Sequence, residues 1–212
     1  MTTFITTLHA TGTGPRLAVK DLIDVAGVPT TAGCRAVART STPAVADAAC
    51  LAGARAADAG IVGKTNPHEL AMLPLGTNPW FGTPVNPLDP SLIAGGSSSG
   101  SAVAVANPAG RYRAGLRHRR ANPSALGVLR NRRGEDDTRP GERAGRAAAG
   151  PSLDTVGPTA SSVAGVAAGM ALLEPGFRPD PTGARVIGRL RTAGDPRIGP
   201  RWMTRSGPPS SR

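Results

Sequence analysis

Residues 94–102 of the chain read AGGSSSGSA, and this run organises the interpretation of the segments around it. Glycine is entropically costly inside a helix or strand, and serine competes with the backbone for hydrogen bonds, so the run is predicted to be a loop. The small apolar stretch at 102–106 predicts that the loop ends at the start of a buried helix or strand. Such a loop can gather hydroxyl and N–H groups around a reacting atom, but on its own it is equally typical of a flexible linker.

A lysine stands inside an apolar, strand-like stretch upstream, LAVKDLIDV at 17–25. Lysine is rarely buried unless it is paired or has a chemical task, and a desolvated lysine can act as a base. The ordinary alternative is an exposed lysine on an edge strand. Two further stretches precede the glycine–serine run, namely GIVGKTNPHELA at 60–71 and GTNPWFGTPVNP at 76–87.

These four stretches, in this order, resemble the amidase signature family. The resemblance covers 17–106 and resumes at 151–158, which read PSLDTVGP. It implies an α/β fold in which a mixed sheet is flanked by helices, of which this chain would hold only part. It also implies cleavage of carboxamide C–N bonds in a small-molecule amide through an acyl-enzyme, with a Ser–cis-Ser–Lys triad, no cofactor and no metal.

Carried over by position, Lys20 matches the family's base and Ser97 matches its bridging cis-serine. In the family the lysine takes a proton from the bridging serine, which takes one from the nucleophilic serine. His68 is given no role, because the family does not use this position for proton transfer. The resemblance also marks positions that support the loop or approach the substrate: Gly95, Gly96, Ser98, Thr77 and Asn78.

The family's nucleophile segment, D-T-G-G-S, is absent from this chain. Counting forward from Ser97 at the family's spacing reaches Ala121, and Ser124, whose flanks do not match, is the only hydroxyl nearby. We therefore expect a hydrolase by descent whose activity is impaired or lost. A non-catalytic remnant is the alternative.

The charge of the chain is concentrated in two segments. The formal net charge is +11, yet residues 1–106 are balanced. Residues 107–150 hold eleven arginines against four acidic residues, and 178–212 hold eight against two. Two interpretations compete, nucleic-acid-binding arms and out-of-frame translation of a GC-rich coding sequence. We favour the second, because 107–150 replaces a family stretch of similar length; no nucleic-acid partner is then expected, and disorder is predicted for these arginine-rich parts.

A phosphate cradle is the remaining enzymatic alternative, since glycine-rich loops before helices bind phosphates through backbone N–H groups. The glycine–serine run has no lysine at its end, as a P-loop requires. The tripeptide Gly63-Lys64-Thr65 has one, but the residues before it predict a buried strand.

The sequence predicts a partial amidase domain over 1–177, with a divergent arginine-rich insert at 107–150, and a mostly irregular tail over 178–212. Strands are expected at 17–19 and 61–63, a turn at 27–29, a helical turn near Glu69 and a helix near 161–173. A further helix is predicted over 43–59, on the apolar positions Val45, Ala49, Ala52 and Ala56, with Gly60 as its C-cap.

Two cysteines, Cys34 and Cys50, are too few for a disulfide framework and show no metal-ligand spacing. No apolar run is long enough for a membrane span, and the N-terminus does not read as a secretory signal, so the cytoplasm is the expected location. The sequence does not indicate which amide would be cleaved, or the oligomeric state.

Overall fold

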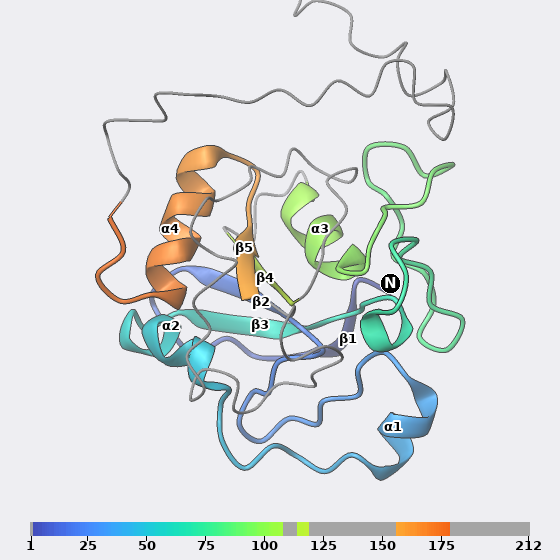
Figure 1. Cartoon of the computed structure of the whole chain (residues 1–212), viewed down its shortest axis with the longest axis horizontal. Helices are drawn as coiled ribbons and strands as arrows, with labels where there is room; N and C mark the ends of the chain where they lie inside the picture. The colour runs from blue at the N-terminus through green and yellow to red at the C-terminus, as the bar shows by residue number, and fades with distance from the viewer. Residues whose placement is uncertain (1, 108–113, 119–155, 179–212) are drawn as a thin grey trace, which may run out of the picture. The chain divides into compact units, whose positions relative to one another are not determined.

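The computed structural model describes residues 2–107, 114–118 and 156–178. The chain divides into two units, Met1–Arg178 and Pro179–Arg212, and every described residue belongs to the first. Its strands form one mixed sheet in the order β1-β3-β2-β4-β5 (Figure 1). The strands are β1 (Phe4–Thr7), β2 (Arg16–Lys20), β3 (Gly60–Thr65), β4 (Ala114–His118) and β5 (Val156–Thr159). The central strand β2 is parallel to both neighbours, whereas β1 and β5 are antiparallel to theirs, so the expected α/β class with a mixed sheet is confirmed.

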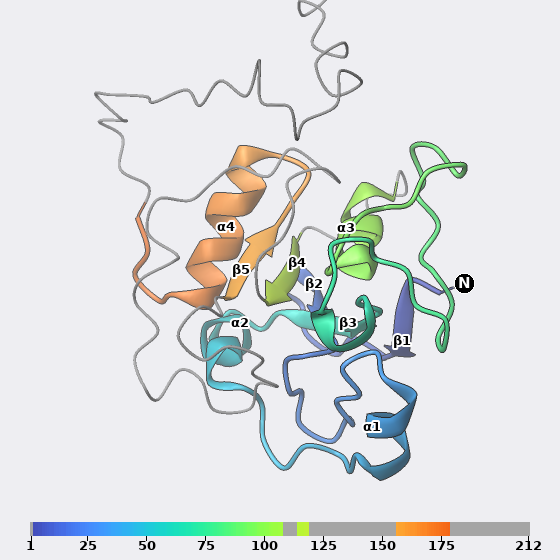
Figure 2. The same ribbon diagram turned by 45° about the vertical axis from the view of Figure 1, so that its right-hand side comes forward.

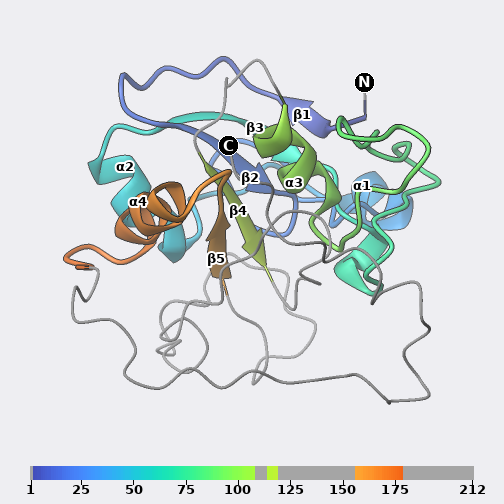
Figure 3. The same cartoon turned by 90° about the horizontal axis from the view of Figure 1, so that it is seen from above.

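Helices cover both faces of this sheet. The helical elements of the described residues are α1 (Arg35–Thr40), the 3-10 turn η1 (Ala49–Leu51), α2 (Ala52–Ala56), the 3-10 turn η2 (Glu69–Ala71), α3 (Ser99–Ala106) and α4 (Val163–Leu173). Figure 3 shows α2 and α4 on one side of the strands and α3 on the other. The loop between β3 and α3 extends beside β1 (Figure 2), where the Asn66 side chain donates to the carbonyls of Thr2 and Gly82.

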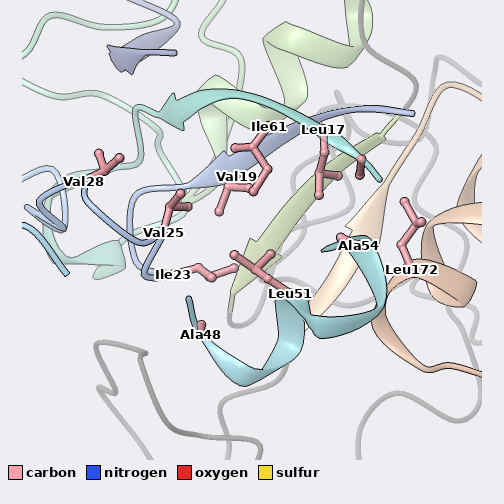
Figure 4. Packing of buried hydrophobic residues seen from close by; sticks show 11 residues of the cluster. Leu17, Val19, Ile23, Val25, Val28, Ala48, Leu51, Ala54, Ile61 and Leu172 are labelled. Carbon is pink, nitrogen blue, oxygen red and sulfur yellow. The ribbon is translucent and has the colours of Figure 1, made fainter. Parts of the chain in front are cut away.

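The pleat of β2 sends alternate side chains into two separate apolar clusters. Leu17 and Val19 join the larger cluster, to which Leu51 of η1, Ala54 of α2 and Leu172 of α4 also belong (Figure 4). Ala18 points to the other face and packs against Ala104 of α3. A fully buried Val, Leu or Ile contributes about 1.5–3 kcal/mol, so the larger cluster holds most of the apolar stabilisation. The next residue in this alternation, Lys20, therefore lies on the α3 face.

The glycine–serine run is a loop only in its first part. Helix α3 begins at Ser99, inside the run, so the expectation that a helix starts after it is corrected. Gly100 is tolerated in the first turn because the helix touches another segment there: a Cβ on it would lie 2.6 Å from the backbone nitrogen of Asn66. The Gly100 N–H donates to the Asn66 carbonyl at 2.8 Å, which ties the start of α3 to the end of β3.

The helix predicted over 43–59 is wrong in its bounds and in the face that it buries. Pro43 and Ala44 form bridges with Pro29 and Ala26, so the chain is extended there, and only 49–56 is helical. The predicted apolar face is exposed, and the buried residues of this stretch are Ala48, Leu51, Gly53, Ala54 and Ala59. Alanine fits either face of a helix, so the spacing of alanines in this segment does not show which face is buried. Gly60 is not a C-cap but the first residue of β3.

The remaining predicted elements fall into two groups. The strands at 17–19 and 61–63, the turn at 27–29, the helical turn near Glu69 and the helix near 161–173 are all present. Within the arginine-rich insert, 114–118 form strand β4 rather than a disordered segment. The rest of that insert and the tail from 179 onward lie outside the described residues, so the domain boundaries stay predictions. Within the described ranges, no helix is long and apolar enough to cross a membrane.

Candidate functional site

Lys20 and Ser97 meet at the C-terminal edge of the central strand. Lys20 is the last residue of β2, and Ser97 stands two residues before α3. The Lys20 Nζ donates a hydrogen bond to Ser97 Oγ over 2.9 Å. Lys20 is fully buried and Ser97 is 3% exposed, so the pair is shielded from water by the protein. The contact expected between these two residues is therefore present, although it does not by itself assign them a catalytic role.

Backbone and hydroxyl contacts fix Ser97 from both directions along the chain. The peptide bond between Gly96 and Ser97 is cis, and Ser97 O accepts from the His68 N–H at 2.9 Å. Behind it, Ser99 Oγ donates to the carbonyl of Asn66, and Ser101 Oγ shares a 2.7 Å hydrogen bond with Thr65 Oγ1. Because Thr65 pairs in register with Lys20, these contacts hold α3 against the same strand end that presents the lysine.

Asn78 is buried and its side chain is occupied by loop contacts. Its Nδ2 donates to the carbonyl of Gly33 and to Oδ1 of Asn66, and it also contacts the carbonyl of Pro67. Its Oδ1 accepts from the N–H groups of Trp80 and Phe81. These contacts favour loop support over substrate contact at this position.

The other predicted positions have fewer contacts. Gly95 has φ +73°, a conformation that L side chains rarely adopt, and Thr77 is partly exposed. Ser98 is buried, and its Oγ has no hydrogen-bond partner among the described residues; the same holds for Nδ1 of His68. Ala121 and Ser124, considered as the position of the nucleophile, lie outside the described residues.

A buried ion pair occupies the opposite face of the same strand ends, and the sequence reasoning missed it. Lys64 Nζ lies 2.9 Å from Asp21 Oδ1, and both side chains have no exposed surface. Lys64 also donates to Thr30 Oγ1 at 2.8 Å, while Asp21 Oδ2 accepts from the N–H and hydroxyl of Thr31. The signal was in the sequence, since Lys64 stands in an apolar strand just as Lys20 does. This pairing also removes Lys64 from the role of a phosphate-binding lysine.

The described part of the chain offers no group of three or more His, Cys, Asp or Glu side chains arranged to hold a metal ion. Neither cysteine forms a disulfide among the described residues; Cys34 is buried and Cys50 partly buried. The site described above therefore consists of an amine, hydroxyls and backbone groups.

Comparison with known proteins gives a match to one protein family and to similar curated proteins. The family described as Amidase matches residues 13–111. Amidase 1 of Oryza sativa subsp. japonica is 46% identical over 93 residues, which are 44% of this chain and 21% of that protein. Indoleacetamide hydrolase of Pseudomonas savastanoi is 44% identical over 94 residues, 44% of this chain and 20% of that protein.

A solved structure extends the likeness over most of the chain. The peptide amidase PAM, solved in complex with the competitive inhibitor chymostatin, superimposes with a TM-score of 0.61 at 30% identity. The match covers 83% of this chain and 37% of that one. The chain spans about a fifth of the length of the curated relatives it matches.

Proposed function

Because residues 13–111 make this chain a member of the amidase family, we propose that Lys20 and Ser97 are the base and the bridging serine of a proton relay for carboxamide hydrolysis. The observation that carries the proposal is the buried 2.9 Å contact between Lys20 Nζ and Ser97 Oγ. A hydroxyl held against a buried amine can pass its proton to that amine and accept another from a nucleophile beside it. The pair is thus suited to activate a neighbouring hydroxyl rather than to attack the amide itself.

The full reaction needs a third group that Ser97 can deprotonate. That hydroxyl would attack the amide carbonyl, and its proton would pass through Ser97 to Lys20. The returning proton would leave with the amine, and water would then release the acid from the acyl-enzyme. The family's D-T-G-G-S segment, which would supply the hydroxyl, is not in this sequence. We therefore propose that the chain keeps the base side of the relay and has lost its nucleophile, so that it cleaves amides poorly or not at all.

The direct test measures ammonia release from simple amides by the purified chain. We expect no rate above that of the uncatalysed reaction, because activation of a nucleophile contributes nothing where no nucleophile is positioned. The Ser97→Ala variant should behave identically. Turnover by the unmodified chain that disappears in Ser97→Ala would contradict the proposed loss of function, because it would mean that a nucleophile, either Ser97 itself or a hydroxyl that Ser97 deprotonates, is still in place.

The coding DNA tests why the nucleophile is missing. If two compensating frame changes produced the arginine-rich insert, one of the other frames across 107–150 should encode a string like D-T-G-G ending near Ala121. Such a string would explain why the family-like sequence resumes at 151. Its absence from both alternative frames would show that the frame-change account is wrong.

A further inference from the structure

At the ends of the central strands, two consecutive residues carry side chains on opposite faces of the sheet: Lys20, the last residue of β2, with Asp21 after it, and Lys64 with Thr65 at the end of β3. On the α3 face, Lys20 contacts Ser97 and Thr65 contacts Ser101. On the other face, Asp21 and Lys64 form the buried ion pair. The Lys20–Ser97 contact and the Asp21–Lys64 ion pair therefore lie on opposite faces of the sheet, at the ends of the same two strands.

We propose that the Asp21–Lys64 ion pair is a positioning element that directs the Lys20 amine at Ser97, an inference that rests on the proposed relay. Backbone contacts join the two faces: the Asp21 N–H donates to the Thr65 carbonyl at 3.1 Å, and the Lys20 carbonyl accepts from the N–H groups of Leu22 and Ile23. A rotation of the strand end that turned Lys20 away from Ser97 would also pull Asp21 away from Lys64. The ion pair resists that rotation.

Each partner of the pair is itself anchored, so the restraint extends to a third segment. The Lys64 amine reaches the Thr30 hydroxyl at 2.8 Å, and Thr30 donates in turn to Asp24 Oδ1 at 2.6 Å. Asp21 Oδ2 accepts from Thr31. The other oxygen, Oδ1, meets no N–H or O–H in hydrogen-bond geometry among the described residues, and the Lys64 charge balances it. Loss of Lys64 would leave that buried carboxylate without a counter-charge, and the strand end would have to move to solvate it.

The chain offers an unusually direct probe, because Lys20 and Lys64 are its two lysines. In full-length protein labelled with 13C at lysine Cε, NMR should show one side-chain signal from each. The spectrum of the Lys64→Met variant retains only the Lys20 signal, and this assigns both signals of the unmodified chain. Ser97→Ala defines where the Lys20 signal moves when its hydroxyl partner is removed.

We expect the Lys20 signal in Lys64→Met to be displaced from its position in the unmodified chain toward its position in Ser97→Ala. Lys64→Arg, which keeps the positive charge, should bring it back. Asp47→Asn is the matched control: it removes the carboxylate of a partly exposed ion pair with Arg55 and should leave the signal in place. An unchanged Lys20 signal in folded Lys64→Met would overturn the proposal and leave the pair a purely structural one.

A second variant keeps the test decisive if Lys64→Met does not fold. Thr30→Val removes one hydrogen-bond partner of Lys64 and leaves both charges present, so a smaller displacement in the same direction is expected. No displacement in Thr30→Val would then overturn the proposal. If Ser97→Ala itself fails to move the Lys20 signal, the contact between Lys20 and Ser97 is wrong, and the proposed relay fails with the inference that rests on it.

Discussion

At the scale of single residues, the two lysines of the chain differ in the chemistry of their partners. Both are fully buried, and burial of a lysine is tolerated only where a partner satisfies the amine. Lys20 faces the hydroxyl of Ser97, whereas Lys64 faces the carboxylate of Asp21. The first arrangement allows a proton to move between the partners, and the second fixes a charge in place. Under the two proposals, the same residue type acts as a base on one face of the sheet and fixes the strand ends on the other.

Asn78 gives a prediction at this scale. Its amide joins the 33, 66–67 and 80–81 backbone segments, so Asn78→Ala would leave several buried polar groups without partners. Each such group costs about 1–3 kcal/mol, and we expect the free energy of unfolding to fall by at least about 2 kcal/mol in urea titrations. Asn86→Ala is the control, because the Asn86 side chain accepts a local N–H bond from Leu88 and no other among the described residues, and its loss should cost within about 0.5 kcal/mol. Equal losses in the two variants would show that Asn78 does not hold these loops together.

At the scale of elements, how much could be predicted depended on how distinctive the local pattern was. Strands β2 and β3 and helix α4 could be predicted because apolar runs bounded by turn residues, or a serine N-cap, identify them. The segment at 43–59 could not, because its alanines give no unique buried face and Pro43 is held extended by Pro29. Strand β4 could not either, since it lies in an arginine-rich segment and its pairing with β2 is a long-range contact.

The candidate site likewise contains residues that the sequence predicted and residues that it did not. The positions of Lys20 and Ser97 followed from the order of motifs, and their contact is present at 2.9 Å. The Asp21–Lys64 pair did not follow, although Lys64 was visible as a charged residue in an apolar strand. A sequence shows that a buried lysine needs a partner, but it does not show which carboxylate the fold brings to it.

The Asp47–Arg55 contact gives a prediction for the short helix α2. Hydrogen bonding from the Arg55 guanidinium, aided by the N–H of Ala26, holds the pKa of Asp47 below its ordinary value of 3.8. A carboxyl whose pKa is lower in the folded state contributes stability above its unfolded pKa and loses that contribution as the pH falls through the folded pKa. The pair is 43% exposed at Arg55 and 24% at Asp47, so the contribution is at most about 1 kcal/mol.

Thermal unfolding of Asp47→Asn against the unmodified chain checks this. The difference in unfolding free energy should be present near neutral pH and should disappear once the pH falls well below 3.8, where both chains carry an uncharged side chain. A difference that stays constant down to strongly acidic pH would assign the contribution to packing instead of charge.

At the scale of the whole molecule, the family likeness and the excess charge occupy different parts of the sequence. The family match ends at 111, and residues 1–106 carry no net charge. The positive excess lies in 107–150 and 178–212. The described unit thus combines a balanced, family-like part, which contains Lys20 and Ser97, with a sheet completed by β4 and β5. The central claim is that this part preserves the base side of an amidase relay.

The most direct test is a chimera in which residues 13–106 of this chain replace the matching segment of Amidase 1 from Oryza sativa subsp. japonica, which would supply the nucleophile. We expect the chimera to hydrolyse amides, and Lys20→Ala or Ser97→Ala to lower its kcat by about 10²–10⁴-fold, as loss of a general base does. Asp47→Asn in the same chimera should leave kcat unchanged. An active chimera whose kcat survives both Lys20→Ala and Ser97→Ala would contradict the account.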